Sequence, residues 1–402
     1  MKKISTQGLI LGILLVSVGA IPLLPRDGFA QTKKQNPLQS TTPDPLLPQR
    51  SIERPFSPLE RYRLETSLEQ LNNEATDLFN AGNLEQAFQV WYREIRLRRE
   101  LGPIEEVTAL GRVGEMAWRE NRKEDVQLIT QRLETIQKES AKNSALLTAL
   151  GKAYQQIRVP KLAVVVYQEI LTNAEQSRDI EAQQSALETI GTLHLAWFDY
   201  TAAAETYERL LELARSHSDS FNEVNYLQQL SYIYTQLSEP ENAVKVKETL
   251  LQEYQDTENF EQLAALKIAI ADDYKAINDP EKASQSYQEA FALAWKEELF
   301  SQASEALQKL GDLYREYEQP EYALQVYQEL VKVHQQAYNY YGLMNTYDQM
   351  GQIYLVQQDY SQALIVFEKG LEIAQSLSYQ EAYFDSQIAA INQEIQPNPS
   401  SL

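Results

Sequence analysis

The chain has 402 residues, a formal net charge of −21 and no cysteine. A chain without cysteine has neither a disulfide framework nor a thiolate metal site, and a surface of this charge repels the phosphates of nucleic acids. Glycine is scarce at 14 residues, and β-branched residues do not gather in alternating runs, so a large sheet is not expected.

Residues 1–30 have the features of an export signal. Two lysines precede the apolar segment 9–20, and the tripeptide Gly-Phe-Ala at 28–30 places small residues before a candidate cleavage point. The apolar segment is short for a membrane-spanning helix. We therefore predict cleavage and export to the periplasm or another extracytoplasmic space, with an uncleaved membrane anchor as the alternative.

Residues 31–56 follow as a proline-rich leader. They contain five prolines among Gln, Ser and Thr and show no apolar period. This composition predicts a disordered or polyproline-like segment.

Helical order is predicted to begin at Ser57. The stretch Ser-Pro-Leu-Glu at 57–60 is a capping box with proline at the first helical position. The helix should reach about Asn80, before the Gly-Asn pair at 82–83, and a second helix follows. The second helix carries an arginine cluster, which consists of Arg93, Arg96, Arg98 and Arg99. We interpret the cluster as a solvated face, with an acidic partner or lipid headgroups as the alternative.

Two series of small residues run in phase through residues 57–378. The second series stands twelve residues after the first, and the period is 39, 37 and then 40 residues. The first series is Ala75, Gly114, Gly151, Gly191, Ser231, Ala271, Gly311 and Gly351. The second is Ala87, Val126, Ala163, Ala203, Ala243, Ala283, Ala323 and Ala363. In most of the later copies a tyrosine stands three residues after the first series and four after the second. The pattern predicts eight helical hairpins.

The spacing has a physical reason. Small residues at a helix crossing let antiparallel helices approach, and a larger side chain there should cost about 1–3 kcal/mol by overpacking. The tyrosines fill the space between hairpins with apolar area. Because one hairpin cannot bury both of its faces, the hairpins should stack into a solenoid. Residues 379–396 are predicted to form a C-terminal capping helix, and 397–402 a disordered tail.

These motifs resemble the tetratricopeptide repeat, whose signature places Leu-Gly and Tyr on one helix and Ala on the next. The segments that carry the resemblance are LTALGKAY at 147–154, LQKLGDLY at 307–314 and YDQMGQIY at 347–354. The period of forty exceeds the usual thirty-four, which indicates a long-repeat variant with longer helices. The resemblance implies an all-α, right-handed superhelical solenoid whose first helices line a concave groove.

Projection of the first helices places the residues one and four positions after each small residue in this groove. The candidate partner-binding residues are Lys152, Gln155, Thr192, Leu195, Tyr232, Thr235, Asp272, Lys275, Asp312, Arg315, Gln352 and Leu355, together with Asp348 from one turn earlier. This mixed polar set suits an extended peptide that is bound through side-chain hydrogen bonds and charges.

Asp272 and Asp312 hold equivalent positions on neighbouring first helices. Their oxygens suit a hard cation such as Mn²⁺ or Ca²⁺. Lys275 and Arg315, one turn further on, favour ordinary salt bridges between repeats. We expect salt bridges and no cofactor, with a metal site at the two aspartates as the alternative.

The sequence contains no phosphate-binding glycine loop, nucleophile elbow or zinc spacing, so no enzymatic activity is predicted. We predict an extracytoplasmic scaffold or assembly factor that binds a protein or peptide and no nucleic acid.

The signal, repeat number and acidity also resemble the processing-associated tetratricopeptide proteins of the cyanobacterial periplasm. That resemblance implies a role in photosystem II assembly, with the C-terminal tail of the D1 subunit and manganese as ligands. A membrane-tethered scaffold with an uncleaved anchor is a further alternative.

Overall fold

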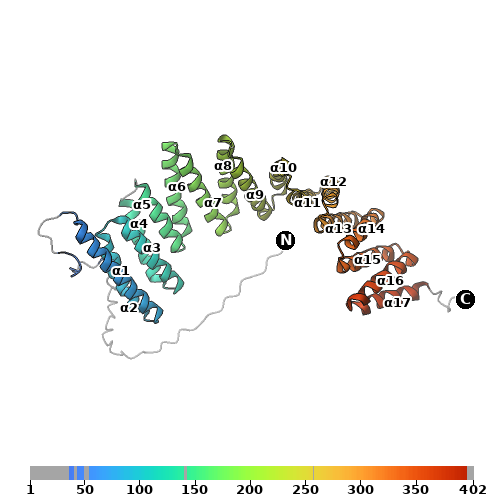
Figure 1. Cartoon of the computed structure of the whole chain (residues 1–402), viewed down its shortest axis with the longest axis horizontal. Helices are drawn as coiled ribbons and strands as arrows, with labels where there is room; N and C mark the ends of the chain where they lie inside the picture. The colour runs from blue at the N-terminus through green and yellow to red at the C-terminus, as the bar shows by residue number, and fades with distance from the viewer. Residues whose placement is uncertain (1–35, 40–42, 49–53, 140–142, 257, 396–402) are drawn as a thin grey trace, which may run out of the picture. The chain divides into compact units, whose positions relative to one another are not determined.

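The computed structural model describes residues 36–39, 43–48, 54–139, 143–256 and 258–395. Within these residues every regular element is a helix, which confirms the predicted all-α fold class. The predicted signal peptide and the predicted tail at 397–402 lie outside the described residues. The chain divides into two compact units, residues 1–100 and residues 101–402, and each is described by itself (Figure 1). None of the described helices combines the length and apolar character that a membrane crossing requires.

The first unit contains one hairpin and a short 3-10 helix. Helix α1 (Pro58–Asn80) begins at the predicted capping box, because the Glu60 N–H donates to Ser57 Oγ at 3.3 Å and the Ser57 N–H donates to the Glu60 carboxylate at 2.8 Å. Gly82 in the turn adopts a φ of 80°, and α2 runs over Leu84–Arg99. The small residues at positions 75 and 87 are buried, so the first predicted hairpin is confirmed.

Part of the leader packs against α2. The 3-10 helix η1 (Pro37–Gln39) buries Leu38, and the Asp44 carboxylate pairs with Arg93 at 2.7 Å. The prediction of a leader without fixed structure is therefore wrong for these residues. Side-chain contacts from α2 hold them, and no apolar period in the leader reveals such contacts. For the same reason, the arginine cluster is not purely a solvated face.

The second unit contains seven hairpins and a terminal helix. Each hairpin pairs an odd-numbered first helix with an even-numbered second helix. The hairpins are α3 (Pro103–Arg119) with α4 (Lys123–Glu139), α5 (Ser144–Gln156) with α6 (Pro160–Ser177), α7 (Ile180–Ala196) with α8 (Tyr200–Ser216), α9 (Ser220–Leu237) with α10 (Pro240–Asp256), α11 (Phe260–Ala276) with α12 (Pro280–Lys296), α13 (Phe300–Glu316) with α14 (Pro320–Gln336), and α15 (Tyr340–Val356) with α16 (Tyr360–Leu377). With the hairpin of the first unit they make the eight that the sequence predicts.

The terminal helix α17 (Glu381–Ile395) packs against α16. It buries Phe384 and Ile391. A Cβ atom added to Gly370 of α16 would lie 2.2 Å from the Phe384 ring, so the two helices are in close contact. Helix α17 covers the apolar face of the last hairpin, as predicted for a capping helix.

The turns of the second unit recur every twenty residues. From Arg158 to Ser378, each twentieth residue is a non-glycine in the left-handed region, with φ between 50° and 60°. The residue after it donates its N–H to a carbonyl five positions back, as Asp199 does to His194, which closes a Schellman-type cap. Helices α7 to α16 are consequently 17 or 18 residues long.

Four glycines of the first series contact rings of their own second helices. A Cβ atom at Gly311 would lie 2.3 Å from a ring carbon of Tyr327, and one at Gly351 would lie 2.6 Å from Phe367. Real Cβ atoms essentially never approach that closely, and both rings are fully buried. The close helix crossing that the spacing predicts is therefore present.

Candidate functional site

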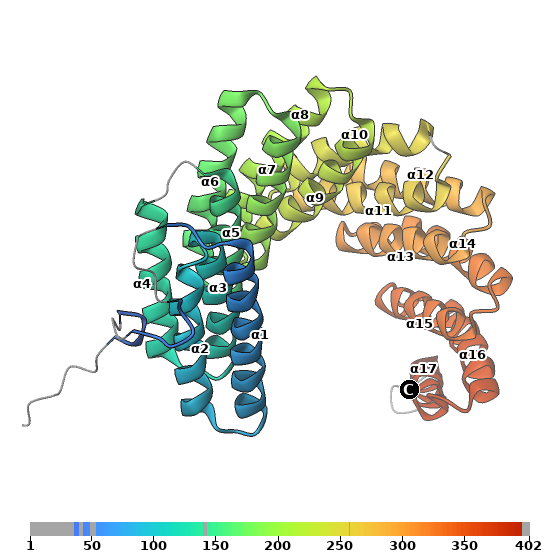
Figure 2. The ribbon, with the colours of Figure 1, turned by 60° about the vertical axis from the view of Figure 1, so that its left-hand side comes forward.

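Within the second unit, the odd-numbered helices line one face and the even-numbered helices line the opposite face (Figure 2). Ion pairs join neighbouring first helices on the odd-numbered side, since Asp272 and Lys275 of α11 pair with Lys309 and Glu316 of α13. We call this side the inner face and define it by the predicted groove residues.

All the predicted groove residues are at least partly accessible. The exposed ones are Lys152, Thr192, Tyr232, Thr235 and Arg315. The half-buried ones are Gln155, Leu195, Asp272, Lys275, Asp312, Asp348, Gln352 and Leu355. The helical projection therefore selects accessible positions, and their binding of a partner stays a prediction.

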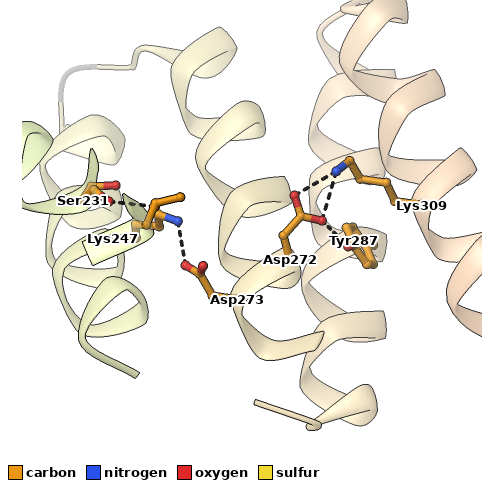
Figure 3. Close-up of polar contacts among 7 residues, drawn as sticks. Ser231, Lys247, Asp272, Asp273, Tyr287 and Lys309 are labelled. Carbon is orange, nitrogen blue, oxygen red and sulfur yellow. Dashed lines mark hydrogen bonds and ion pairs between the residues drawn. The ribbon is translucent and has the colours of Figure 1, made fainter. Parts of the chain in front are cut away.

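Asp272 is held from two neighbouring helices (Figure 3). Tyr287 of α12 donates its hydroxyl to Asp272 Oδ1 at 2.5 Å, and Lys309 Nζ of α13 donates to the two carboxylate oxygens at 3.1 and 2.8 Å. A salt bridge between repeats is therefore present, as predicted. Its cation is Lys309 rather than Lys275, which pairs with Glu316 at 2.5 Å.

Asp312 and Asp348 repeat part of this arrangement. Tyr327 of α14 donates its hydroxyl to Asp312 at 2.8 Å, and Arg315 lies 3.8 Å from the same carboxylate. Asp348 accepts a hydrogen bond from Tyr383 of α17 at 2.7 Å. Burial and the neighbouring carboxylate raise the pKa of Tyr383 to about 12. Each of these carboxylates is thus fixed in place by a tyrosine hydroxyl.

Two second-helix tyrosines donate their hydroxyls to carboxylates of the inner face. The pairs are Tyr287–Asp272 and Tyr327–Asp312. Burial raises the pKa of both hydroxyls, so they stay protonated. We call the three carboxylates that tyrosine hydroxyls hold, Asp272, Asp312 and Asp348, the polar ladder. The sequence pattern predicts the second-helix tyrosines as packing residues and does not reveal this second role, although the spacing of 15 positions in both pairs was available as a signal.

Lys247 interrupts the tyrosine series. It takes the tyrosine position of its hairpin and donates to Asp273 Oδ2 at 2.6 Å (Figure 3). The two residues are only 5% and 9% exposed. Burial raises the pKa of Asp273 even though the Lys247 ammonium opposes the shift. This buried ion pair joins α10 to α11.

The carboxylates proposed as metal ligands already have partners. Asp272 binds an ammonium and a hydroxyl, and Asp312 binds a hydroxyl. Among the described residues, no group of three or more His, Asp or Glu side chains is arranged to hold a metal ion. A hard cation at Asp272 would therefore have to displace Lys309.

The second half of the chain matches one known protein family. Residues 198–396, just under half of the chain, match the family model of the soluble NSF attachment protein, SNAP. No curated protein sequence matches the chain significantly.

Several solved structures are similar. BtubC from P. vanneervenii is 16% identical with a TM-score of 0.37, over 60% of this chain and 94% of its own. A signal-transduction ATPase with a tetratricopeptide repeat sensor, from Pyrococcus horikoshii, is 14% identical with a TM-score of 0.42, over 77% and 50%. A Rap protein in complex with competence and sporulation factor is 15% identical with a TM-score of 0.31, over 82% and 98%. The hairpins themselves define the chain as an all-α helical repeat protein, and its pattern resembles the tetratricopeptide repeat.

Proposed function

We propose that the second unit is a non-enzymatic protein-interaction scaffold that binds an extended polypeptide along its inner face. The observation that carries the proposal is the polar ladder. It presents carboxylates on the successive first helices α11, α13 and α15, and an extended chain can meet such groups one after another.

The tyrosine hydroxyls support this proposal through preorganisation. Each ladder carboxylate is already oriented by a tyrosine hydroxyl from a packed neighbouring helix, so less side-chain entropy is lost when a partner binds. Tyr232 and Arg315 are exposed on the same face. Tyrosine and arginine are the residue types that most often dominate binding energy, and we propose these two as the anchors.

Affinity capture tests the site. The protein without residues 1–30 is immobilised and exposed to extracytoplasmic extract, and the retained proteins are identified. We expect Arg315→Glu and Tyr232→Ala each to reduce retention about tenfold, which corresponds to the loss of one strong contact. The matched control is Lys245→Glu, the same kind of charge reversal at an exposed position on the second helix α10. Equal retention by all four proteins, with unchanged helical circular dichroism, would overturn the proposed site.

We propose that this scaffold works outside the cytosol because of the signal-like features of residues 1–30. N-terminal sequencing of the exported protein tests the location. A first residue at or near Gln31 supports cleavage, whereas a mature protein that begins at Met1 supports the membrane-tethered alternative.

Photosystem II assembly is a narrower alternative that rests on resemblance in architecture. Its manganese would need converging oxygen ligands, and the pairing of Asp272 with Lys309 favours a scaffold without metal. Equilibrium dialysis with Mn²⁺ and Ca²⁺ separates the two. Stoichiometric binding that Asp272→Asn abolishes would restore the metal hypothesis. Capture of the D1 tail by the same protein would support the assembly role.

A further inference from the structure

The leader carries the same tripeptide pattern twice. Asn36-Pro37-Leu38 and Asp44-Pro45-Leu46 stand eight residues apart. In each copy the side-chain oxygen of the first residue accepts a hydrogen bond from the leucine N–H, at 2.9 Å for Asn36 and 3.0 Å for Asp44. Both copies therefore form Asx turns around a proline. We call them the Asx-Pro-Leu turns.

The second turn is held by a bidentate ion pair. Arg93 Nε and Nη2 donate to the two carboxylate oxygens of Asp44 at 2.7 and 2.9 Å. The two parallel bonds fix the orientation of the carboxylate as well as its position. The Arg93 hydrogen bonds lower the pKa of Asp44 from its ordinary value, which agrees with a well-formed pair.

The first turn is held by its backbone and its leucine. Arg96 Nη1 donates to the Pro37 carbonyl at 2.5 Å, and Arg99 Nη2 donates to the Leu38 carbonyl at 3.1 Å. The Leu38 side chain is only 1% exposed. Arg93, Arg96 and Arg99 follow one another at three-residue spacing, so they lie close together on α2.

We propose that this surface of α2 is a binding site for Asx-Pro-Leu segments and that the leader is its resident ligand. The contacts recognise one carboxylate, two carbonyls and one leucine. A segment from another polypeptide that forms the same turns can therefore make the same contacts. The leader competes from within the chain at an effective concentration on the order of millimolar, so an external segment binds well only when the leader is displaced.

The test uses the full chain and a labelled synthetic peptide with the sequence of residues 36–48. A released variant, Leu38→Asp with Asp44→Arg, removes the buried leucine and reverses the charge that Arg93 holds. Fluorescence anisotropy should show the peptide binding to the released variant at least about tenfold more tightly than to the unmodified chain, because the resident ligand no longer competes. Equal binding to both chains, or binding to neither, would overturn the proposal.

A charge swap makes the test specific to the site. A peptide that carries Asp44→Arg should lose at least about tenfold in affinity for the released variant. Arg93→Glu should recover it when it is placed in a chain that carries Leu38→Asp with Asp44→Asn, whose leader has no arginine to compete, as expected for a close charge pair. Failure of the swap to recover binding would place the peptide elsewhere. Binding of the released variant to anionic lipid vesicles without binding to the peptide would also contradict the proposal. If the released variant loses helical circular dichroism, Asp44→Asn alone takes its place in each comparison.

Discussion

Two junctions between hairpins of the second unit have different side chains at equivalent positions: one junction is apolar and the other contains a buried ion pair. Between α12 and α13, the tyrosine at 287 and the leucine at 313 belong to one apolar cluster, and the hydroxyl of Tyr287 reaches the surface at Asp272. Between α10 and α11, the equivalent positions hold Lys247 and Asp273, which form a buried ion pair at 2.6 Å. The Tyr287 hydroxyl reaches the inner face in the first junction, whereas the charged groups of Lys247 and Asp273 stay buried in the second.

The difference shows which part of the repeat is needed for stacking. The helices and turns keep their twenty-residue spacing through both junctions, so the backbone arrangement does not depend on tyrosine. What changes is the free energy of the contact. Apolar burial stabilises without a penalty, whereas a buried ion pair must first offset the desolvation of two charges. The raised pKa of Asp273 shows that desolvation outweighs the attraction of Lys247 at this site.

The largest expected effect comes from breaking the ion pair. Lys247→Met leaves the Asp273 carboxylate buried without its partner, which should lower the free energy of unfolding by about 3–5 kcal/mol. Restoring the common residues in Lys247→Tyr with Asp273→Leu should recover that loss and add up to about 1–4 kcal/mol. Ala271 shows that a small residue with a Cβ is compatible with a tyrosine, so Ser231 should accommodate the new ring.

Urea denaturation followed by circular dichroism measures these differences, and hydrogen exchange in α10 and α11 shows where they arise. The comparison of the two junctions would be wrong if the double variant were no more stable than Lys247→Met alone.

The second-largest expected effect concerns how the free energy of unfolding changes with pH. Because the folded state raises the pKa of Asp273 above its ordinary value of 3.8, the folded state binds this proton more tightly than the unfolded state. The contribution of Asp273 to stability therefore falls as the pH rises from about 4 through the raised pKa. The double variant lacks this group, so its stability advantage over the natural chain should grow from pH 4 to pH 7. The growth is about 1.4 kcal/mol for each pH unit by which the pKa is raised.

Urea titrations of both proteins at several pH values check this prediction, since most other titrating groups are common to the two. An advantage that stays constant between pH 4 and pH 7 would show that Lys247 fully compensates the burial of Asp273.

The hairpins could be predicted from the sequence because their determinants are local and periodic. Small residues stand at the positions of Gly311 and Ala323 in nearly every copy, always at the same spacing, and that spacing alone defines a helix crossing. The capping box at Ser57 is also a contiguous motif. These features depend on residues within one hairpin, so no knowledge of distant contacts was needed.

The missed contacts join residues whose relation appears only after folding. Lys309 reaches Asp272 from the next hairpin, 37 positions away, and Lys247 reaches Asp273 across 26 positions. A signal for the second pair existed, because Asp273 stands at a position that is apolar in the neighbouring copies. The repeated Asx-Pro-Leu pattern of the leader was likewise visible, but α2 had to be in place to show what it contacts.

The smallest expected effect concerns the turns inside two neighbouring hairpins. Asp279 is the N-cap of α12 and its side chain accepts the Lys282 N–H at 3.2 Å, whereas Gln319 is the N-cap of α14 and makes no side-chain cap. Gln319→Asp should supply the missing acceptor for the Tyr322 N–H and place a negative charge at the positive end of the helix.

We expect this substitution to raise the free energy of unfolding by about 0.5–1 kcal/mol and Asp279→Ala to lower it by a similar amount. Protection of the Tyr322 amide from hydrogen exchange separates a new cap from a general charge effect, because only the cap slows exchange at that position. If Gln319→Asp stabilised the chain without protecting Tyr322, the gain would come from the helix dipole, and the two turns would differ less than their caps indicate.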